Sequence, residues 1–222
     1  MTQTLQRTDA ELKGAVTEEL VWTAGLNSAN IGVAADDGAV TLSGEVESYP
    51  EKLRAEQAML RVAGVTAFAD EITVRGSWEG VNDTDIARSA GEALNLCVDV
   101  PGGEVKAAVH DHAITLSGRV TWYYQREAAA SAVQSLPGVS HVNNMITIRP
   151  AVKTRDIKAA ILAALVRSAQ IESAHTIVMA DDVGVVTLDG RVRSWSERRE
   201  AENAAWTAVG VTDVVNHLRI EN

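Results

Sequence analysis

The side chains that could bind a metal ion are concentrated in one short stretch of the chain. His110 and His112 flank Asp111, and a His-x-His pair can hold zinc when further ligands converge on it. The other histidines are scattered and match no ligand spacing: His141, His175 and His217. Because no third ligand accompanies the pair, we interpret this stretch as a solvent-exposed turn and predict no metal site.

Acidic and thiol groups give no stronger indication of chemistry. The pairs Asp36–Asp37 and Asp181–Asp182 could attract a cation weakly, but aspartate-rich turns are common because their carboxylates bond nearby amides. Cys97 is the only cysteine and has no acid–base partner beside it, so we expect a buried or unreactive thiol. Glycine-rich nucleotide loops, nucleophile elbows and Cys-x-x-Cys motifs are absent. We therefore predict that the protein is not an enzyme and binds no cofactor.

The composition is that of a globular protein with a substantial core, since 46% of the 222 residues are apolar. A net charge of −10 repels nucleic-acid phosphates and argues against a nucleic-acid partner. The opening residues, MTQTLQRTDAELKG, contain no apolar run, so we expect neither an export signal nor a membrane span. The expected location is the cytoplasm, or the periplasm if an export signal has been removed from a mature form.

Three copies of one unit account for most of the sequence. Gly44, Gly118 and Gly190 lie 74 and 72 residues apart, and a second glycine follows each of them after 20 residues: Gly64, Gly138 and Gly210. Around these glycines run the segments TLSGEVESYPEKLRAEQAMLRVAGV, TLSGRVTWYYQREAAASAVQSLPGV and TLDGRVRSWSERREAENAAWTAVGV. A fixed period of this kind indicates a repeated structural unit.

Each unit begins with a predicted helix. Leu12, Val16 and Leu20 are spaced as one helix face, and the same spacing recurs twice, at Ile86, Ala90 and Leu94 and at Ile157, Ile161 and Leu165. The helices are expected to start at caps formed by Thr8 or Asp9, by Asp83 or Thr84, and by Thr154.

Two strands, a second helix and a third strand follow. Alternation at Ile31, Val33 and Ala35 predicts a half-buried strand, and the Asp-Asp-Gly turn after it predicts a hairpin, for which the middle unit has the poorer sequence His-Asp-His-Ala. The first glycine lies in the second strand, where a missing side chain would let a helix approach or the strand bulge. Capping boxes starting at Ser48 and Ser194 open the second helix. The second glycine is expected to end that helix in a left-handed conformation, with the next valine folded back.

The unit is therefore helix, strand, strand, helix, strand. The expected domains are residues 8–76, 83–150 and 154–222, joined by short linkers at Arg75–Asp83 and Arg149–Thr154. Linkers of this length keep neighbouring units close, so we expect limited contact between them.

With this order of elements, the paired glycines and the strand Val40–Val46 (VTLSGEV), the sequence resembles the BON family, the bacterial OsmY and nodulation domain. The resemblance covers nearly the whole chain, three times over. It implies an α+β fold of three tandem αββαβ domains, each a small three-stranded mixed sheet with two helices packed on one face. It also implies binding of phospholipid surfaces or partner proteins, often in envelope stress, and it brings no catalytic residues.

An aromatic residue stands five positions after the first glycine of every unit, at Tyr49, Tyr123 and Trp195. Trp122 and Tyr124 extend the middle one into a run of three. Such rings suit a membrane interface or a protein-binding hot spot, or they attach the helix entry to the core of their own domain. Three consecutive rings cannot all point inward, so at least one is expected to be exposed.

Basic residues gather around Trp195 in the third unit, which is close to neutral: Arg191, Arg193, Arg198 and Arg199. They could bind an anionic headgroup or an acidic partner. The alternative is a solvated helix face with ion pairs to Glu197, Glu200 and Glu202.

We therefore predict a non-enzymatic binding or scaffolding protein in a bacterial stress or envelope-associated role. Its partner is expected to be a phospholipid surface or a protein, contacted through the aromatic helix entries. The alternative is a cytoplasmic ion or small-ligand sensor whose site is formed by the acidic turns and interdomain clefts.

Overall fold

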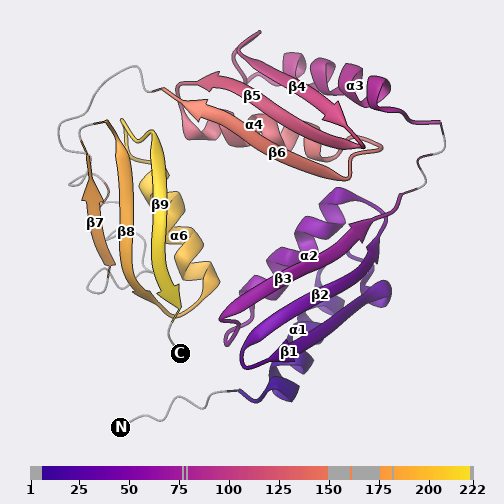
Figure 1. Ribbon diagram of the computed structural model, residues 1–222, viewed down its shortest axis with the longest axis vertical. Coiled ribbons are helices and arrows are strands. Elements are labelled where there is room, and N and C mark those ends of the chain that lie inside the picture. Colours follow the sequence, from indigo (N-terminus) through magenta and orange to yellow (C-terminus); the bar gives the residue numbers. More distant parts are fainter. Residues whose placement is uncertain are drawn as a thin grey trace.

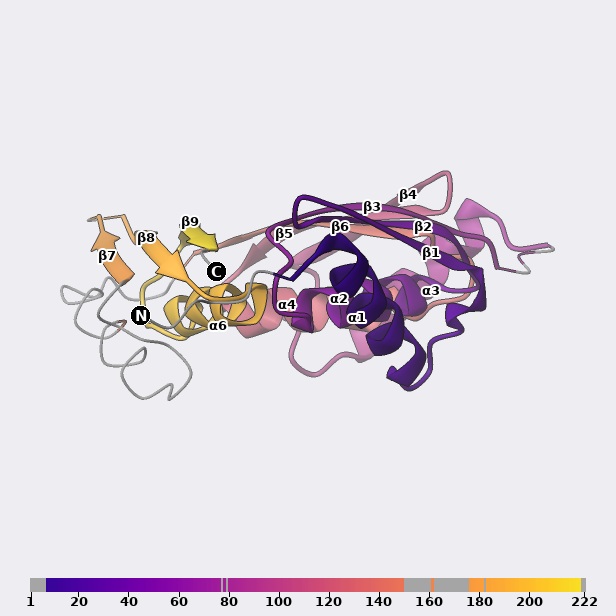
Figure 2. The same cartoon turned by 90° about the horizontal axis from the view of Figure 1, so that it is seen from below.

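The computed structural model describes residues 7–76, 78, 80–149, 161, 176–181 and 183–220. These residues form three separate three-stranded sheets arranged around a common centre (Figure 1). In the perpendicular view, the sheets lie on one side of the molecule and the helices on the other (Figure 2). The predicted α+β fold, with one small mixed sheet and its helices repeated three times, is confirmed.

The helices and strands follow the order expected from the repeats. Unit 1 contains α1 (Asp9–Trp22), the 3₁₀ turn η1 (Ser28–Asn30), β1 (Ile31–Asp36), β2 (Ala39–Val46), α2 (Tyr49–Arg61) and β3 (Ala67–Val74). Unit 2 contains α3 (Asp83–Leu96), β4 (Val105–His110), β5 (Ala113–Val120), α4 (Tyr123–Gln134) and β6 (His141–Ile148). The described elements of unit 3 are β7 (Thr176–Ala180), β8 (Val185–Val192), α6 (Trp195–Trp206) and β9 (Asp213–Ile220). The helix predicted at the start of unit 3, with its cap at Thr154, lies outside the described residues except for Ile161, which is helical and buried.

In every sheet the middle strand has one antiparallel and one parallel neighbour. β2 runs antiparallel to β1 and parallel to β3, and β5 and β8 pair in the same way with their own neighbours. A parallel neighbour cannot be reached through a tight turn, so α2, α4 and α6 each form a crossover. The antiparallel pairing has the same register in all three sheets. The first glycine of each unit lies opposite the first residue of the edge strand, which is Ile31, Val105 or Thr176.

The core of each unit lies between its sheet and its helices. Leu12, Val16 and Leu20 are fully buried, as their spacing predicts, and belong to the same cluster as Val40 and Leu42 of the central strand. The equivalent helix residues of unit 2 are buried as well. Burial of one such side chain stabilises the fold by about 1.5–3 kcal/mol.

Side-chain caps set the starts of the first helices. Thr8 and Glu11 form a capping box at α1, in agreement with one of the two expected caps. At α3 the cap is Asn82, whose Oδ1 accepts from the amide three residues further on at 3.1 Å. The prediction of Asp83 or Thr84 as the cap is therefore wrong by one or two residues.

The second helices start as predicted in units 1 and 3. The hydroxyls of Ser48 and Ser194 accept hydrogen bonds from the backbone amides three residues further on, at 3.4 and 3.1 Å. In unit 2 the cap residue is Trp122, and Gln125 Oε1 accepts from the amides of Thr121 and Trp122, each at 3.0 Å. The glutamine side chain thus binds the chain entering the helix, while no side chain accepts from the amides of the first turn in the way that Ser48 and Ser194 do.

The hairpin turn of unit 2 shows how its unfavourable sequence is accommodated. Asp111 and His112 both have positive φ, at 48° and 63°. Asp83, which is not the helix cap, accepts hydrogen bonds from both of their amides, at 2.9 and 3.0 Å. The ring of His112 stacks on Trp78 with centroids 4.6 Å apart and is partly buried. The expected exposed turn is therefore correct for His110 and wrong for His112.

The first glycine of units 1 and 2 is required by a close backbone contact. A Cβ on Gly44 would collide with the carbonyl oxygen of Asn30, and a Cβ on Gly118 with that of Glu104. Both glycines also have positive φ, at 123° and 144°. The close neighbour is thus the chain entering the edge strand, and not the helix or the bulge that we expected.

The second glycine has the expected positive φ but does not end the helix. Gly64, Gly138 and Gly210 have φ values of 103°, 86° and 99° and lie in the turn after the helix, whose last residues are Arg61, Gln134 and Trp206. The valine after each glycine is buried as predicted: Val65, Val139 and Val211.

Replacing Gly118 by alanine should destabilise the protein by about 3 kcal/mol or more, because the new Cβ meets the Glu104 carbonyl in a strained backbone conformation. The control is Gly91→Ala in α3, where a Cβ would meet nothing within 4 Å and where better helix propensity should add about 0.5–1 kcal/mol. Urea unfolding followed by circular dichroism measures both changes. Equal stabilities of the two variants would show that the carbonyl contact does not constrain the strand.

Candidate binding surfaces and the central cavity

Three ring–ring contacts join the units in a cycle. The pairs and their centroid distances are Tyr49–His141 at 5.7 Å, Tyr123–Trp206 at 4.5 Å and Trp195–Phe68 at 5.3 Å. The first pair joins unit 1 to unit 2, the second joins unit 2 to unit 3, and the third joins unit 3 back to unit 1. Each aromatic residue at a helix entry therefore contacts a neighbouring unit.

This placement adds a contact between units to the two interpretations of the helix-entry rings. Tyr49 is only 7% exposed, and Tyr123 and Trp195 are partly buried, so these rings lie between units. Trp122 and Tyr124 are 41% and 55% exposed, in agreement with the expectation that the run cannot all point inward. Of the five aromatic candidates, these two present the most ring surface to an external partner.

The sequence patterns do not single out the partner rings Phe68, His141 and Trp206. Trp206 stands at the repeat position that is occupied by Leu60 in unit 1 and by Gln134 in unit 2. The sequence signal for this interface was therefore the aromatic residue Trp206 at a repeat position where the other two copies have no aromatic residue.

Arg198 is bound to the third strand of its own unit. Its guanidinium donates to the carbonyls of Asn216 and Leu218, at 2.7 and 3.1 Å. Lys52 and Arg126 occupy the equivalent helix positions and donate to carbonyls of β3 and β6. Because this contact recurs in all three units, Arg198 has a structural role here.

The other three candidate arginines occupy two different places. Arg191 lies near the end of β8, in register with Arg219 of β9, and Arg193 follows in the turn; both are exposed and both interact with neighbouring groups. Arg199 lies on α6 in the wall of a central cavity that Trp195 also lines. Only Arg198 and Arg199 therefore share a site with Trp195.

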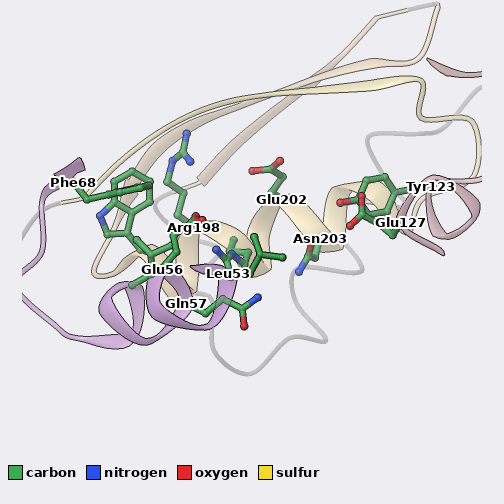
Figure 3. A pocket seen from close by; sticks show the side chains of 12 residues that line it. Leu53, Glu56, Gln57, Phe68, Tyr123, Glu127, Arg198, Glu202 and Asn203 are labelled. Carbon is green, nitrogen blue, oxygen red and sulfur yellow. The ribbon is translucent and has the colours of Figure 1, made fainter. Parts of the chain in front are cut away.

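The central cavity has a volume of about 510 Å³ and is lined by side chains of all three units (Figure 3). Its charged groups come from one helix of each unit: Glu56 from α2, Glu127 from α4, and Arg198, Arg199 and Glu202 from α6. In Figure 3, Glu56 and Phe68 lie toward one end of the cavity and Tyr123 and Glu127 toward the other. Charges of both signs and aromatic surfaces thus meet in one space.

Burial changes the acid–base properties of groups between the units. It raises the pKa of Tyr123 to about 12, and the neighbouring carboxylate of Glu127 adds to this effect. Burial also raises the pKa of Tyr49 above its usual value. In the cavity, burial raises the pKa of Glu56, although the guanidinium of Arg199 offsets part of the effect. Each of these groups therefore gives up its proton at a higher pH in the folded protein than in the unfolded chain.

Large apolar side chains are exposed at equivalent positions of units 1 and 2. Trp22 and Leu96 are 79% and 82% exposed, and each is the last residue of its first helix. Val21 and Val98 lie beside them in the sequence and are also exposed. The sequence signal that we did not use is an apolar residue off the buried helix face, repeated after 74 positions.

Within the described ranges, no group of three or more histidine, cysteine, aspartate or glutamate side chains could hold a metal ion. The same residues contain no helix that is both long and apolar enough to cross a bilayer. Asp181 accepts from the amides of Val183 and Val185, at 3.0 and 2.8 Å, which is the local role expected for an acidic turn. Cys97 is a partly buried free thiol.

A family model described as the BON domain matches residues 8–76, 82–150 and 153–222, and the chain therefore belongs to the BON family. It is also similar to the osmotically-inducible protein Y of Escherichia coli K12, with 33% identity over 141 residues. That alignment covers 61% of this chain and 70% of the E. coli protein.

Among solved structures, the chain matches two of CdsD, a structural protein of the type III secretion system of Chlamydia trachomatis, and one of the PrgH periplasmic domain. The C-terminal domain of CdsD has 14% identity and a TM-score of 0.27, covering 97% of this chain and 100% of that one. The PrgH domain has 12% identity and a TM-score of 0.22, covering 92% and 99%. Scores this low carry no statement about function.

Replacing Trp206 by alanine should destabilise the protein by about 3–5 kcal/mol, because this buried ring stacks on Tyr123 of the neighbouring unit. Trp22→Ala, which removes an exposed ring, should change stability by less than about 0.5 kcal/mol. A double-mutant cycle with Tyr123→Ala, measured by urea unfolding, should give a coupling of about 1 kcal/mol. Strict additivity of the two changes would show that the stack does not connect the units.

The raised pKa of Tyr123 predicts loss of stability at alkaline pH. The unfolded phenol ionises near pH 10, whereas the folded one ionises at about pH 12, so the stabilisation is complete below pH 10 and is lost as the pH rises toward 12. Urea midpoints measured across this range should fall less steeply for Tyr123→Phe than for the wild type. Tyr124→Phe, which changes an exposed ring, serves as the control. Identical slopes in the wild type and Tyr123→Phe would contradict the prediction.

Proposed function

We propose that this protein is a non-enzymatic binding protein of the bacterial osmotic-stress response that attaches to phospholipid surfaces. The three BON domains and the similarity to an osmotically inducible relative support the stress-related, envelope-associated setting. The observation that carries the attachment is the exposure of Trp22 and Leu96 at equivalent positions of two units.

Exposed side chains of this size gain free energy when an apolar phase covers them. Tryptophan suits the boundary between lipid and water, because its ring is apolar and its N–H is polar. Full burial of one such side chain contributes about 1.5–3 kcal/mol, so two anchors acting together support measurable binding. Val21 and Val98 enlarge the two anchors, and Trp122 and Tyr124 offer further ring surface in unit 2.

The charges beside the anchors favour apolar insertion over electrostatic attraction. Glu18 and Glu19 precede Val21 in α1, and the whole chain carries a net charge of −10. We therefore expect little preference for anionic over neutral lipid. In the third unit, Arg191 and Arg193 are the groups that we propose to contact headgroup phosphates.

We further propose a periplasmic location. The osmotically inducible relative and the envelope role implied by the family support this location over the cytoplasmic one. The ion-sensor alternative draws no support from the acidic turn at Asp181, because that carboxylate is already bonded to nearby amides.

Co-sedimentation with phosphatidylcholine vesicles and with phosphatidylglycerol vesicles tests the proposal. The double variant Trp22→Ser/Leu96→Ser should bind at least tenfold more weakly than the wild type, because both anchors lose their apolar surface. The matched control is Met145→Ser/Ile177→Ser, which removes two apolar side chains, each 61% exposed, from β6 and β7 on the sheet side. This control should bind like the wild type.

Two outcomes would contradict the proposal in different ways. If Met145→Ser/Ile177→Ser bound more weakly and Trp22→Ser/Leu96→Ser did not, the lipid-binding surface would be on the sheet side of the molecule. Absence of binding to both kinds of vesicle would reject the lipid surface and leave a protein as the partner for the same anchors.

A further inference from the structure

The outward-facing edge of each sheet is formed by the first strand of its unit. In Figure 1, β1, β4 and β7 lie on the outside of the three-unit arrangement, whereas β3, β6 and β9 face the centre. Among the described strands, each first strand pairs with the central strand of its sheet alone. An edge of this kind carries backbone N–H and C=O groups that can pair with a further strand. The side chains on the edge strand decide whether such pairing is favoured.

The exposed face of β7 differs from that of the other two edge strands. Ile177 and Met179 are 61% and 51% exposed, and Val183 in the following turn is 66% exposed. Large apolar side chains on an edge strand promote pairing between molecules, whereas a lysine protects the edge. The positions equivalent to Ile177 and Met179 are occupied by Gly32 and Ala34 in β1 and by Lys106 and Ala108 in β4. Of these three edges, only β7 therefore presents large apolar side chains.

The strand β7 is complementary to a second copy of itself. When two β7 strands pair antiparallel about a two-fold axis at Val178, Ile177 of each copy lies opposite Met179 of the other. Both apolar pairs then lie on one face of the joined sheet, where the two side chains of each pair cover each other. The segment Thr176–Ala180 contains no charged residue, so this pairing places no like charges opposite each other.

The charges beside the strand are also complementary in this register. Asp189 lies opposite Ile177, so Arg191, two residues further along β8, belongs to the same sheet face. Asp181 of the second copy comes into the row of Arg191, two strand spacings or about 10 Å away. Opposite charges thus approach each other at both ends of the paired strands. The third unit as a whole is close to neutral, so two copies repel each other less there than at the acidic first unit.

We propose that β7 is a dimerisation edge, through which two copies of this chain join their third sheets into one six-stranded sheet. The paired segment of five residues is about 17 Å long. An interface of this length falls below the roughly 1,200 Å² that stable complexes bury. The dimer is therefore weak and reversible, and it forms at high protein concentration.

Sedimentation equilibrium of the full chain tests the dimer. We expect the average mass to rise from that of one chain toward that of two between about 10 µM and about 1 mM, as a weak symmetric interface requires. Met179→Lys and Ile177→Lys each place a charge in the apolar pairs and should weaken association at least about tenfold. The matched control is Ala34→Lys, an exposed change at the equivalent position of β1, which should associate like the wild type. Circular dichroism verifies that each variant folds.

Cysteine cross-linking tests the register of the two strands. Ile177→Cys and Met179→Cys are each made together with Cys97→Ser, so that each chain has a single thiol. A mixture of the two variants in oxidised glutathione should form a disulfide-linked dimer, because the two positions face each other at about 5 Å between Cα atoms. Either variant alone should cross-link at least about fivefold less, because like positions are then offset by two residues and lie about 8 Å apart.

The proposal is overturned if the chain stays monomeric over the whole concentration range, or if Ala34→Lys weakens association as much as Met179→Lys. A dimer that persists in both lysine variants of β7 forms through another surface and overturns the proposal as well. Equal cross-linking in the mixture and in each variant alone would contradict the register. The anchors Trp22 and Leu96 are unchanged in all these variants, so failure of the dimer leaves the lipid proposal standing, and the reverse also holds.

Discussion

The arrangement of the molecule depends on the contact between Trp195 and Phe68, whose ring centroids are 5.3 Å apart. Short linkers connect units 1 and 2 and units 2 and 3, whereas no linker connects units 3 and 1 directly. An aromatic pair of this kind contributes about 0.5–1.5 kcal/mol beyond the area that it buries. α2 and α6 also contact each other, and Arg199 lies near enough to Glu56 to affect its pKa. These contacts complete the ring and enclose the central cavity.

A second set of interactions is repeated within every unit and does not depend on the ring. The basic residue of the second helix bonds the third strand, and one side chain on that strand accepts from the amide two residues further on. The three acceptors are Asp70, Asn144 and Asn216, at 3.0, 3.2 and 3.1 Å. Because these partners lie in the same register in each copy, the fold of a unit is specified locally, while the surface residues around it are free to differ.

The sequence predicted the framework of the units well, because repetition and periodicity report local structure. The glycine intervals and the buried triplet from Leu12 to Leu20 were accessible in this way, whereas the mixed sheets were implied by the resemblance to the BON family. The contacts between units were not, because Tyr123 meets Trp206 only through a docking geometry that no periodicity encodes. The cap at Asn82 was missed for a related reason, since Asp83 is drawn away to a hairpin distant in sequence.

The three ring contacts differ in the partner that each helix entry meets: a histidine, a tryptophan and a phenylalanine. Although the units share one fold, the surfaces through which they contact each other are therefore not interchangeable, and each fits one neighbour. Changing the order of the copies along the chain would preserve the core of every unit, but the ring–ring contacts between units would no longer be formed by the same pairs. The residues that differ between the copies at these three contacts therefore determine which unit packs against which.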